Sequence, residues 1–342
     1  MARERWLLAR MGAVAAAAMV AAMPACTGGE GAGSPRPSPT AASTAVSPTS
    51  AAEGRLTIFH ATHLDGNYFY EDGRTFAHYA ALLKHLRSAL PDPGASLFLG
   101  NGDDITPELR RRTVTGYDVG QERLADSGGL GAIAALNAAG LDVDTYGYNE
   151  LEWLDRLVRV IPRARFAVVS ANVRDRRGGE VYGAQFGARQ WVIKNVGGVR
   201  IGITGLLNAD AARFAGPEVQ VLDPVTALRE VVPRLRAAGA DLVVVLSHLD
   251  TRTEAQQVAK NVAGIDLILG THIGELLPEP TRVDGALLSV PQFGLDGFGQ
   301  LDLTVSKGRL IDVAFRQHTV RASGPEDPEV SSILRRYGGR PG

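Results

Sequence analysis

Residues 55–67 read RLTIFHATHLDGN, an apolar run that ends in two histidines and an aspartate. The first five residues have the composition of a buried β-strand, and the polar residues follow where that strand would end. In α/β proteins, functional side chains gather where the strands end and the loops begin. This stretch therefore predicts a central strand and, directly after it, a candidate site.

The same arrangement of an apolar run and a polar loop recurs along the chain. It is found again in residues 96–104, 143–150, 241–248 and 265–272. Amphipathic patterns predict helices over residues 76–90, 130–142, 224–240 and 255–264. Closing antiparallel strands are expected in residues 286–293, 297–310 and 311–320. The alternation predicts an α/β domain whose central strands are hydrophobic on both faces.

The composition limits the classes of partner. The chain has 342 residues, of which 45% are hydrophobic, and this is enough to build a substantial core. Its formal net charge is −1, so there is no electrostatic reason to expect nucleic acid as a partner. We expect no nucleic-acid binding.

The N-terminal residues 1–26 are predicted to be a lipoprotein signal peptide. Three arginines precede the apolar stretch AVAAAAMVAAM, which is too short to span a bilayer comfortably. Cys26, the only cysteine, follows a small residue, as at bacterial lipoprotein processing sites. We expect Cys26 to carry the lipid that attaches the exported protein to the membrane of the cell envelope. The alternative is an ordinary secretory signal in which Cys26 has no role.

Three further segments follow the signal. Residues 27–53 are dominated by Gly, Ser, Thr, Pro and Ala and predict a disordered tether. Residues 54–321 are expected to form one catalytic-type domain. Residues 322–342 are expected to be a C-terminal tail with at most one short helix.

Several metal-binding residue types follow the predicted strands. Four of the seven histidines do so, as do Asp103 and the pair formed by Asn149 and Glu150. The four histidines are His60, His63, His248 and His272. Loops at one edge of a sheet would bring these groups together, and their mixed nitrogen and oxygen ligands suit Mn, Fe or Zn better than Ca. Any one of these histidines alone is more often a structural residue.

Taken in order, these motifs resemble the catalytic domain of the 5′-nucleotidase branch of the calcineurin-like metallophosphoesterases, over residues 55–320. HATHLDGN stands where the family has H-T-N-D-x-H-G-N, and LFLGNGDD where a strand ends in G-G-D. GLDVDTYGYNELEW is similar to the segment ending G-N-H-E-F-D-W, and VVVLSH and LILGTH to two late histidine loops. The resemblance implies a four-layer αββα sandwich and one or two divalent metal ions.

The resemblance also implies roles for particular residues. Asp103 matches the carboxylate that bridges the metals, and His248 and His272 match two imidazole ligands. The family's D-x-H motif here reads H-x-D, with His63 and Asp65. If this segment is extended, residues two apart point the same way, so His63 and Asp65 could exchange places as ligands.

Other positions depart further from the family's pattern. Tyr148 stands where the family has an asparagine ligand, and Asn149 stands where a catalytic histidine assists the leaving group. With the loop shifted by one residue, Asn149 could instead be the ligand. Gly274 offers no side chain where relatives have a further ligand, and His60 or a water could fill that place.

Three hypotheses of function follow. The first is an exported, lipid-anchored, metal-dependent phosphoester hydrolase that acts on a small phosphoester or a nucleotide-like substrate. The second is a catalytically degenerate binding protein of the same fold at the cell surface. The third is a thiosulfate-ester hydrolase, an activity that the same family branch includes. Full-length 5′-nucleotidases have a second, C-terminal nucleotide-binding domain, and we expect this chain to lack it.

Overall fold

The structure is a computed structural model that describes residues 54–106, 123–124, 126–272 and 276–338. The predicted signal peptide, Cys26 and the predicted tether lie outside these residues, as does Gly274. Within the described ranges, no helix combines the length and the apolar character that crossing a membrane requires.

The first sheet has six strands in the order β14-β13-β1-β2-β3-β4. Strands β1, β2, β3 and β4 run parallel, and β13 and β14 extend the sheet as antiparallel strands beyond β1. The strands are β1 (Gly54–His60), β2 (Ser96–Leu99), β3 (Val143–Thr145), β4 (Ala167–Val169), β13 (Gly297–Ser306) and β14 (Arg309–Thr319).

The second sheet also has six strands, in the order β11-β12-β10-β9-β7-β6. Its four inner strands run parallel, while β6 and β11 pair antiparallel at the two edges. The strands are β6 (Trp191–Val196), β7 (Val199–Leu207), β9 (Leu242–His248), β10 (Leu267–Leu269), β11 (Thr281–Val283) and β12 (Ala286–Ser289). A separate antiparallel ribbon pairs β5 (Val173–Asp175) with β8 (Val219–Val221).

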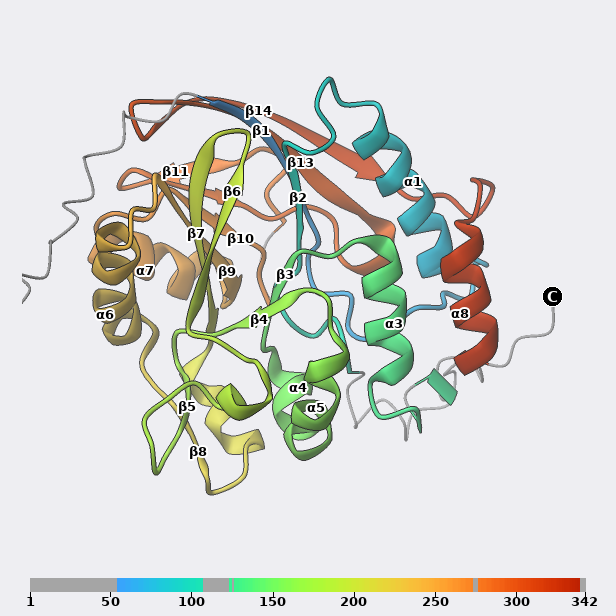
Figure 1. Ribbon diagram of the computed structural model, residues 1–342, viewed down its shortest axis with the longest axis horizontal. Coiled ribbons are helices and arrows are strands. Elements are labelled where there is room, and N and C mark those ends of the chain that lie inside the picture. The colour runs from blue at the N-terminus through green and yellow to red at the C-terminus, as the bar shows by residue number, and fades with distance from the viewer. Residues whose placement is uncertain (1–53, 107–122, 125, 273–275, 339–342) are drawn as a thin grey trace, which may run out of the picture. The chain divides into compact units, whose positions relative to one another are not determined.

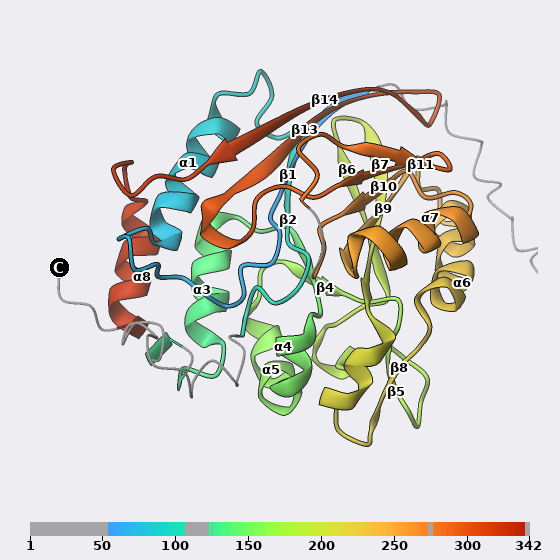
Figure 2. The ribbon, with the colours of Figure 1, turned by 180° about the vertical axis from the view of Figure 1, so that it is seen from behind.

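Helices cover the outer face of each sheet (Figures 1 and 2). On the first sheet lie α1 (Phe76–Ser88) and α3 (Leu130–Ala139), and α8 (Pro328–Gly338) packs against both of these helices. On the second lie α6 (Pro224–Ala237) and α7 (Gln256–Asn261). Two short helices, α4 (Tyr148–Glu152) and α5 (Leu154–Val160), follow β3. The described residues also form the 3₁₀ helices η2 (Ile161–Arg163), η3 (Ala184–Phe186), η4 (Ala209–Phe214) and η6 (Gly294–Asp296), and a π-helical turn, η5 (Thr251–Ala255).

The two sheets face each other across a shared apolar core. Side chains of both sheets meet there, among them Ile58 and Leu99 from the first sheet and Val244 and Leu246 from the second. Each of these four is fully buried, which is worth roughly 1.5–3 kcal/mol per side chain. Because α6 and α7 cover the opposite face, β9 is buried along its whole length. This is why its sequence is a continuous apolar run.

The four-layer αββα prediction is confirmed, and so are most of the predicted elements. The helix expected over residues 76–90 is α1, which begins after an N-cap at Thr75. Gly197 and Gly198, both at positive φ, form the turn of the hairpin between β6 and β7. The segment expected to be a tail contains α8, which buries Val330 and Leu334 against the helices of the first sheet.

Candidate metal centre

The candidate site lies where strands of both sheets end. His63 comes three residues after β1, and Asp103 lies in the loop after β2. His248 is the last residue of β9, and His272 follows β10. Because these strands run parallel within each sheet, their carboxyl ends lie at one edge, and the facing sheets bring the two pairs together.

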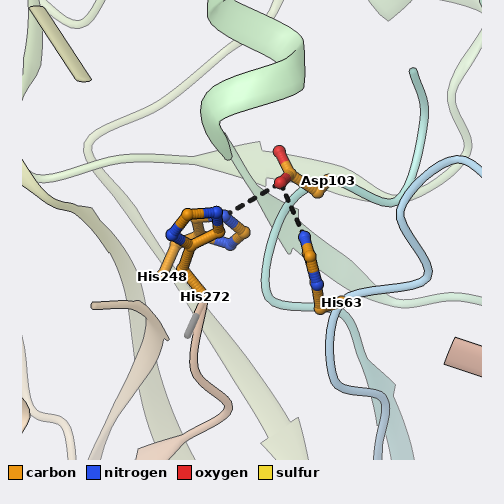
Figure 3. Close-up of side chains that lie close together, drawn as sticks. All are labelled: His63, Asp103, His248 and His272. Carbon is orange, nitrogen blue, oxygen red and sulfur yellow. Dashed lines mark hydrogen bonds and ion pairs between the residues drawn. The ribbon is translucent and has the colours of Figure 1, made fainter. Parts of the chain in front are cut away.

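The four side chains form one compact cluster (Figure 3). One ligand atom from each of them lies within 4.8 Å of all the others. Asp103 is central, because its Oδ2 lies 2.9 Å from Nε2 of His63 and 3.1 Å from Nε2 of His248. Asp103 and His248 are almost completely buried, while His63 and His272 are partly exposed. The cluster therefore has a closed interior and an accessible side.

Charge within the cluster is unevenly distributed. Burial disfavours a charged His63, but its hydrogen bond to Asp103 and the nearby carboxylates outweigh burial and raise the pKa of His63 to about 9. Burial also opposes ionisation of Asp103, yet His248 and His63 hold its pKa well below the ordinary value. For His272, burial and then repulsion from His248 lower the pKa to about 3. The cluster thus stabilises positive charge beside Asp103 and keeps His272 neutral.

These properties fit a divalent metal ion. Nδ1 of His248 lies 2.8 Å from the backbone carbonyl of Asn101 and must donate to it, so in a neutral ring Nε2 is the acceptor. That acceptor faces the Asp103 carboxylate, and the two require a cation or a proton between them. Three imidazoles and a carboxylate form the mixed ligand set typical of Zn, Mn or Fe, with a carbonyl orienting one ring from behind.

Glu150 stabilises the Asp103 loop through hydrogen bonds to the backbone of that loop. The Glu150 carboxylate accepts hydrogen bonds from the backbone N–H groups of Asp103, Ile105, Thr106 and Gly147, at 2.7–3.2 Å. Asp103 itself has φ of +58°, a conformation that costs free energy outside glycine. The carboxylate below the loop stabilises this backbone, which aims the side chain of Asp103 into the cluster.

Asn101 is a second supporting residue, and the sequence analysis missed it. Its Oδ1 accepts from the backbone N–H of His63 at 2.7 Å, and its Nδ2 donates to the carbonyls of Ser247 and Thr271. Asn101 therefore joins the loops that carry all four members of the cluster. The only sequence signal was an amide residue two positions before Asp103, in a loop with glycine on both sides.

Asp65 lies beside the cluster, and the reason given for its placement was wrong. His63 and Asp65 have φ of +52° and +58°, so the segment is a left-handed turn and not extended. Oδ1 of Asp65 lies 4.0 Å from Nε2 of His63 and accepts a hydrogen bond of 3.0 Å from Nδ2 of Asn149. The backbone N–H of Asn149 donates to Oδ1 of Asp103 at 2.7 Å. Asn149 thus contacts two carboxylates at the edge of the cluster.

Tyr148 packs against the cluster by its ring. The ring stacks on that of His272 with the centroids 4.2 Å apart, and the rings of Phe214 and His248 also lie near it, at 5.5 and 5.8 Å. Burial, followed by the charges of Glu254 and Asp210, raises the pKa of Tyr148 to about 12. A phenol held neutral and stacked on His272 limits access to the cluster from this side.

His60 lies apart from the four clustered residues. It is fully buried, its Nε2 lies 3.0 Å from Oγ of Ser289, and its Nδ1 has no hydrogen-bond partner among the described residues. As the last residue of β1, two positions after Ile58, His60 points toward the second sheet. The suggestion that His60 fills a missing ligand position is therefore not supported.

No family model matches the sequence, but individual proteins do. The trifunctional nucleotide phosphoesterase protein YfkN of Bacillus subtilis is 27% identical over 263 residues, which are 70% of this chain and 18% of that protein. The 2′,3′-cyclic-nucleotide 2′-phosphodiesterase/3′-nucleotidase of Haemophilus influenzae is 27% identical over 314 residues, 78% of this chain and 46% of that protein. The chain thus spans less than half the length of these relatives.

Solved structures share the fold. The calcineurin-like phosphoesterase YfkN of Bacillus subtilis superposes with a TM-score of 0.69 at 21% identity, over 84% of this chain and 97% of that chain. The sulfate thiohydrolase SoxB of Thermus thermophilus superposes with a TM-score of 0.70 at 19% identity, over 83% of this chain and 60% of that chain. Fold and sequence likeness together define a calcineurin-like phosphoesterase fold. Within that class, the chain is a divergent relative of the 5′-nucleotidase family.

Proposed function

We propose that this protein is a metal-dependent phosphoester hydrolase. The observation that carries the proposal is the cluster of His63, Asp103, His248 and His272, whose ligand atoms lie within 4.8 Å of one another. The cluster occupies the strand ends of a fold shared with phosphoesterases, and its Asp103 loop is supported by Glu150 and Asn101. A site that no longer binds metal would not need such support, and this favours a working site over a degenerate one.

The four clustered residues would hold the ion. Asp65, whose Oδ1 lies 4.0 Å from Nε2 of His63, could add a fifth ligand oxygen. A bound divalent ion supplies Lewis-acid polarisation of the phosphoryl group and lowers the pKa of a water. The chain itself contributes orientation. Asn101 and Glu150 fix the ligand loops, and the side-chain amide of Asn149 can donate a hydrogen bond to a phosphoryl oxygen but cannot deliver a proton.

The substrate class follows from the relatives by analogy. Both curated relatives act on nucleotides according to their names, so a nucleotide or another small phosphoester is the substrate we infer. The protein is also inferred to be exported and attached to the envelope through a lipid on Cys26, because residues 1–26 have the features of a lipoprotein signal. Mass spectrometry of membrane fractions, with and without Cys26→Ser, tests the attachment.

Metal content and turnover test the main proposal. The protein would be purified without chelator, and Mn, Fe, Zn and Co per chain quantified by elemental mass spectrometry. Hydrolysis of an aryl phosphate would be measured in parallel. We expect one or two equivalents of metal and metal-dependent turnover. Both should be lost in Asp103→Asn, because that substitution removes the carboxylate at the centre of the cluster.

The matched control is Asp92→Asn, which changes an exposed acid in the loop after α1 whose Oδ1 accepts only a local hydrogen bond from the backbone N–H of Gly94. It should leave metal content and turnover unchanged. Metal without turnover of any phosphoester would favour a binding protein. Cleavage of an S-sulfonated thiol with no phosphoester turnover would favour thiosulfate-ester chemistry. A chain that binds no metal even after reconstitution would overturn the proposal.

A further inference from the structure

The two carboxylate oxygens of Asp103 face different partners. Oδ2 lies 2.9 Å from Nε2 of His63 and 3.1 Å from Nε2 of His248, so it belongs to the cluster of imidazoles. The other oxygen points away from those rings (Figure 3). This oxygen, Oδ1, accepts a hydrogen bond of 2.7 Å from the backbone N–H of Asn149, the second residue of α4. Asp103 therefore directs one oxygen to the cluster and the other to α4.

The side chain of Asn149 contacts a second carboxylate. Its Nδ2 donates a hydrogen bond of 3.0 Å to Oδ1 of Asp65, which in turn lies 4.0 Å from Nε2 of His63. The opposite orientation of the amide would place two oxygen acceptors 3.0 Å apart, and neither could donate to the other. Asn149 is buried, with 4% of its surface exposed. It thus turns a backbone N–H toward Asp103 and a side-chain N–H toward Asp65.

The ligand atoms of the cluster converge on one place. One atom from each of His63, Asp103, His248 and His272 lies within 4.8 Å of all the others, and the described part of the chain contains no second group of three or more such residues. Three imidazoles and one carboxylate already make four ligands, the number that a zinc ion usually takes. A second ion beside Asp103 would meet Asp65 on one side and the two N–H groups of Asn149 on the other.

We propose that the cluster binds a single divalent ion and that Asn149 takes the place of a second one. The two N–H groups of Asn149 supply to Asp103 and Asp65 the positive partial charge that buried carboxylates require and that a second cation would otherwise supply. This inference rests on the proposed function, because it concerns the same site. It departs from the pair of ions that the family's bridging carboxylate implies. A single ion still supplies Lewis-acid polarisation of a phosphoryl group.

The metal stoichiometry of the full chain tests this inference. The protein would be stripped with a chelator, reloaded with excess Mn²⁺ at about pH 8, where aspartates are ionised, and freed of unbound metal. Elemental mass spectrometry would give Mn per chain, and electron paramagnetic resonance would show whether the bound ions are isolated or coupled in pairs. We expect one equivalent and the spectrum of an isolated ion. Neither readout depends on turnover.

Asn149→Asp tests the role of the amide directly. The substitution keeps the shape of the side chain but replaces the N–H donor by an oxygen that faces Asp65. Three carboxylates, including that of Asp103, would then lie together, and such oxygen ligands suit Mn²⁺ and Mg²⁺. We expect a second equivalent of Mn and a coupled spectrum. The second ion should bind more weakly than the first, because the backbone N–H still donates to Asp103.

Two matched variants separate the effect of charge from that of space. Asn149→Ala removes the amide and opens the same space without adding a ligand, so it should keep one equivalent. Asp65→Asn, combined with Asn149→Asp, removes one of the three carboxylates and should return the stoichiometry to one. This double variant locates the second ion beside Asp65, and not elsewhere on the surface of the protein.

Two results would overturn the proposal. One is two equivalents of Mn with a coupled spectrum in the wild type, which would mean that a second ion displaces the N–H groups of Asn149. The other is an Asn149→Asp variant that keeps the wild-type circular dichroism spectrum but binds no second ion. If this variant does not fold, the wild-type stoichiometry and spectrum decide alone. Failure of the proposed hydrolase activity is a different result, namely a wild-type chain without metal or without turnover.

Discussion

The side-chain amide of Asn149 donates a hydrogen bond of 3.0 Å to the carboxylate of Asp65. Both residues stand where the sequence departs from the family's motifs, one in H-x-D and one in Y-N-E. The two departures therefore meet in space at the edge of the cluster. The carboxamide of Asn149 can orient a substrate, but it cannot deliver a proton.

This pair predicts how leaving groups affect the rate. Asn149→His would place a proton donor where the chain has none, so hydrolysis of an alkyl phosphate, with its poor leaving group, should accelerate. A general acid is worth ~10²–10⁴-fold, which is the upper limit of the gain. An aryl phosphate leaves readily without a proton and should gain little. The measurement is the ratio of kcat for the two substrates.

Asn149→Ala is the control for this experiment. It removes the hydrogen bond to Asp65 without adding a proton donor, and the backbone N–H of Asn149 still donates to Asp103. The ratio of the two rates should stay at the wild-type value. If Asn149→His speeds or slows both substrates equally, the side chain at this position does not act on the leaving group.

Glu150 provides a second prediction, about the support of the cluster. In Glu150→Gln, one oxygen becomes an NH₂ group facing backbone N–H donors of the Asp103 loop. An unsatisfied buried donor costs roughly 1–3 kcal/mol, so urea unfolding should show a loss of that size. Substitution of residues that orient a metal ligand typically weakens metal binding ~10–100-fold, and we expect a similar loss here.

The neighbouring substitution Glu152→Gln separates this effect from a general change of charge. Glu152 lies on the same helix, α4, but accepts none of the hydrogen bonds from the Asp103 loop that Glu150 accepts. Glu152→Gln should keep both the stability and the metal affinity. Equal losses in the two variants would mean that acidic charge on α4, and not the hydrogen bonds of Glu150, supports the site.

The sequence predicts which polar residues meet at the site, because the direction of the parallel strands alone decides at which edge of the sheet the strands end. His63, Asp103, His248 and His272 each follow an apolar run, and parallel strands place such residues at one edge. The alternation of side chains along a strand also predicts that His60 points into the core between the sheets, because it lies on the same face of β1 as Ile58. That signal was not used.

The backbone of the loops could not be predicted in the same way. His63 and Asp65 adopt positive φ although neither is glycine, and the hydrogen bond from the His63 backbone to Asn101 helps to hold that turn. Such a conformation is decided by contacts between loops far apart in the sequence. For the same reason, the role of Asn101 emerged only when residues 101, 247 and 271 were seen together.

Gly102 provides a third prediction, because its backbone passes close to another loop of the site. A Cβ at this position would lie 2.7 Å from the backbone nitrogen of Gly147, and φ is +90°. Gly102→Ala should therefore separate the two loops, remove the metal and reduce the free energy of unfolding by at least about 3 kcal/mol.

Gly128→Ala is the matched control, since Gly128 has φ of +65° but no atom of the described residues within 4 Å of the added carbon. It should show the conformational cost alone, about 1 kcal/mol, and retain the metal. Urea unfolding and metal content would be measured for both variants. Equal losses of stability would mean that strain at positive φ, and not the contact with Gly147, explains the effect.

His60 makes the folded protein sensitive to acid. Burial lowers the pKa of His60 from its ordinary value of 6.5 to about 3, so the folded chain does not protonate it until strongly acidic pH. The unfolded chain takes up that proton below about pH 6.5. The contribution of neutral His60 to the free energy of unfolding is therefore fully present above pH 6.5 and is lost as the pH falls toward 3. At pH 5 the loss is about 2 kcal/mol.

Substitution of His60 should remove this acid dependence. In His60→Gln, the difference in unfolding free energy between pH 7 and pH 5 should be about 2 kcal/mol smaller than in the wild type, whatever the variant loses at pH 7. Urea unfolding at the two pH values measures it, with the exposed His85→Gln on α1 as control. An unchanged difference in His60→Gln would mean that other buried groups, such as the clustered histidines, cause the acid sensitivity. The buried ring between the sheets would then have only a packing role.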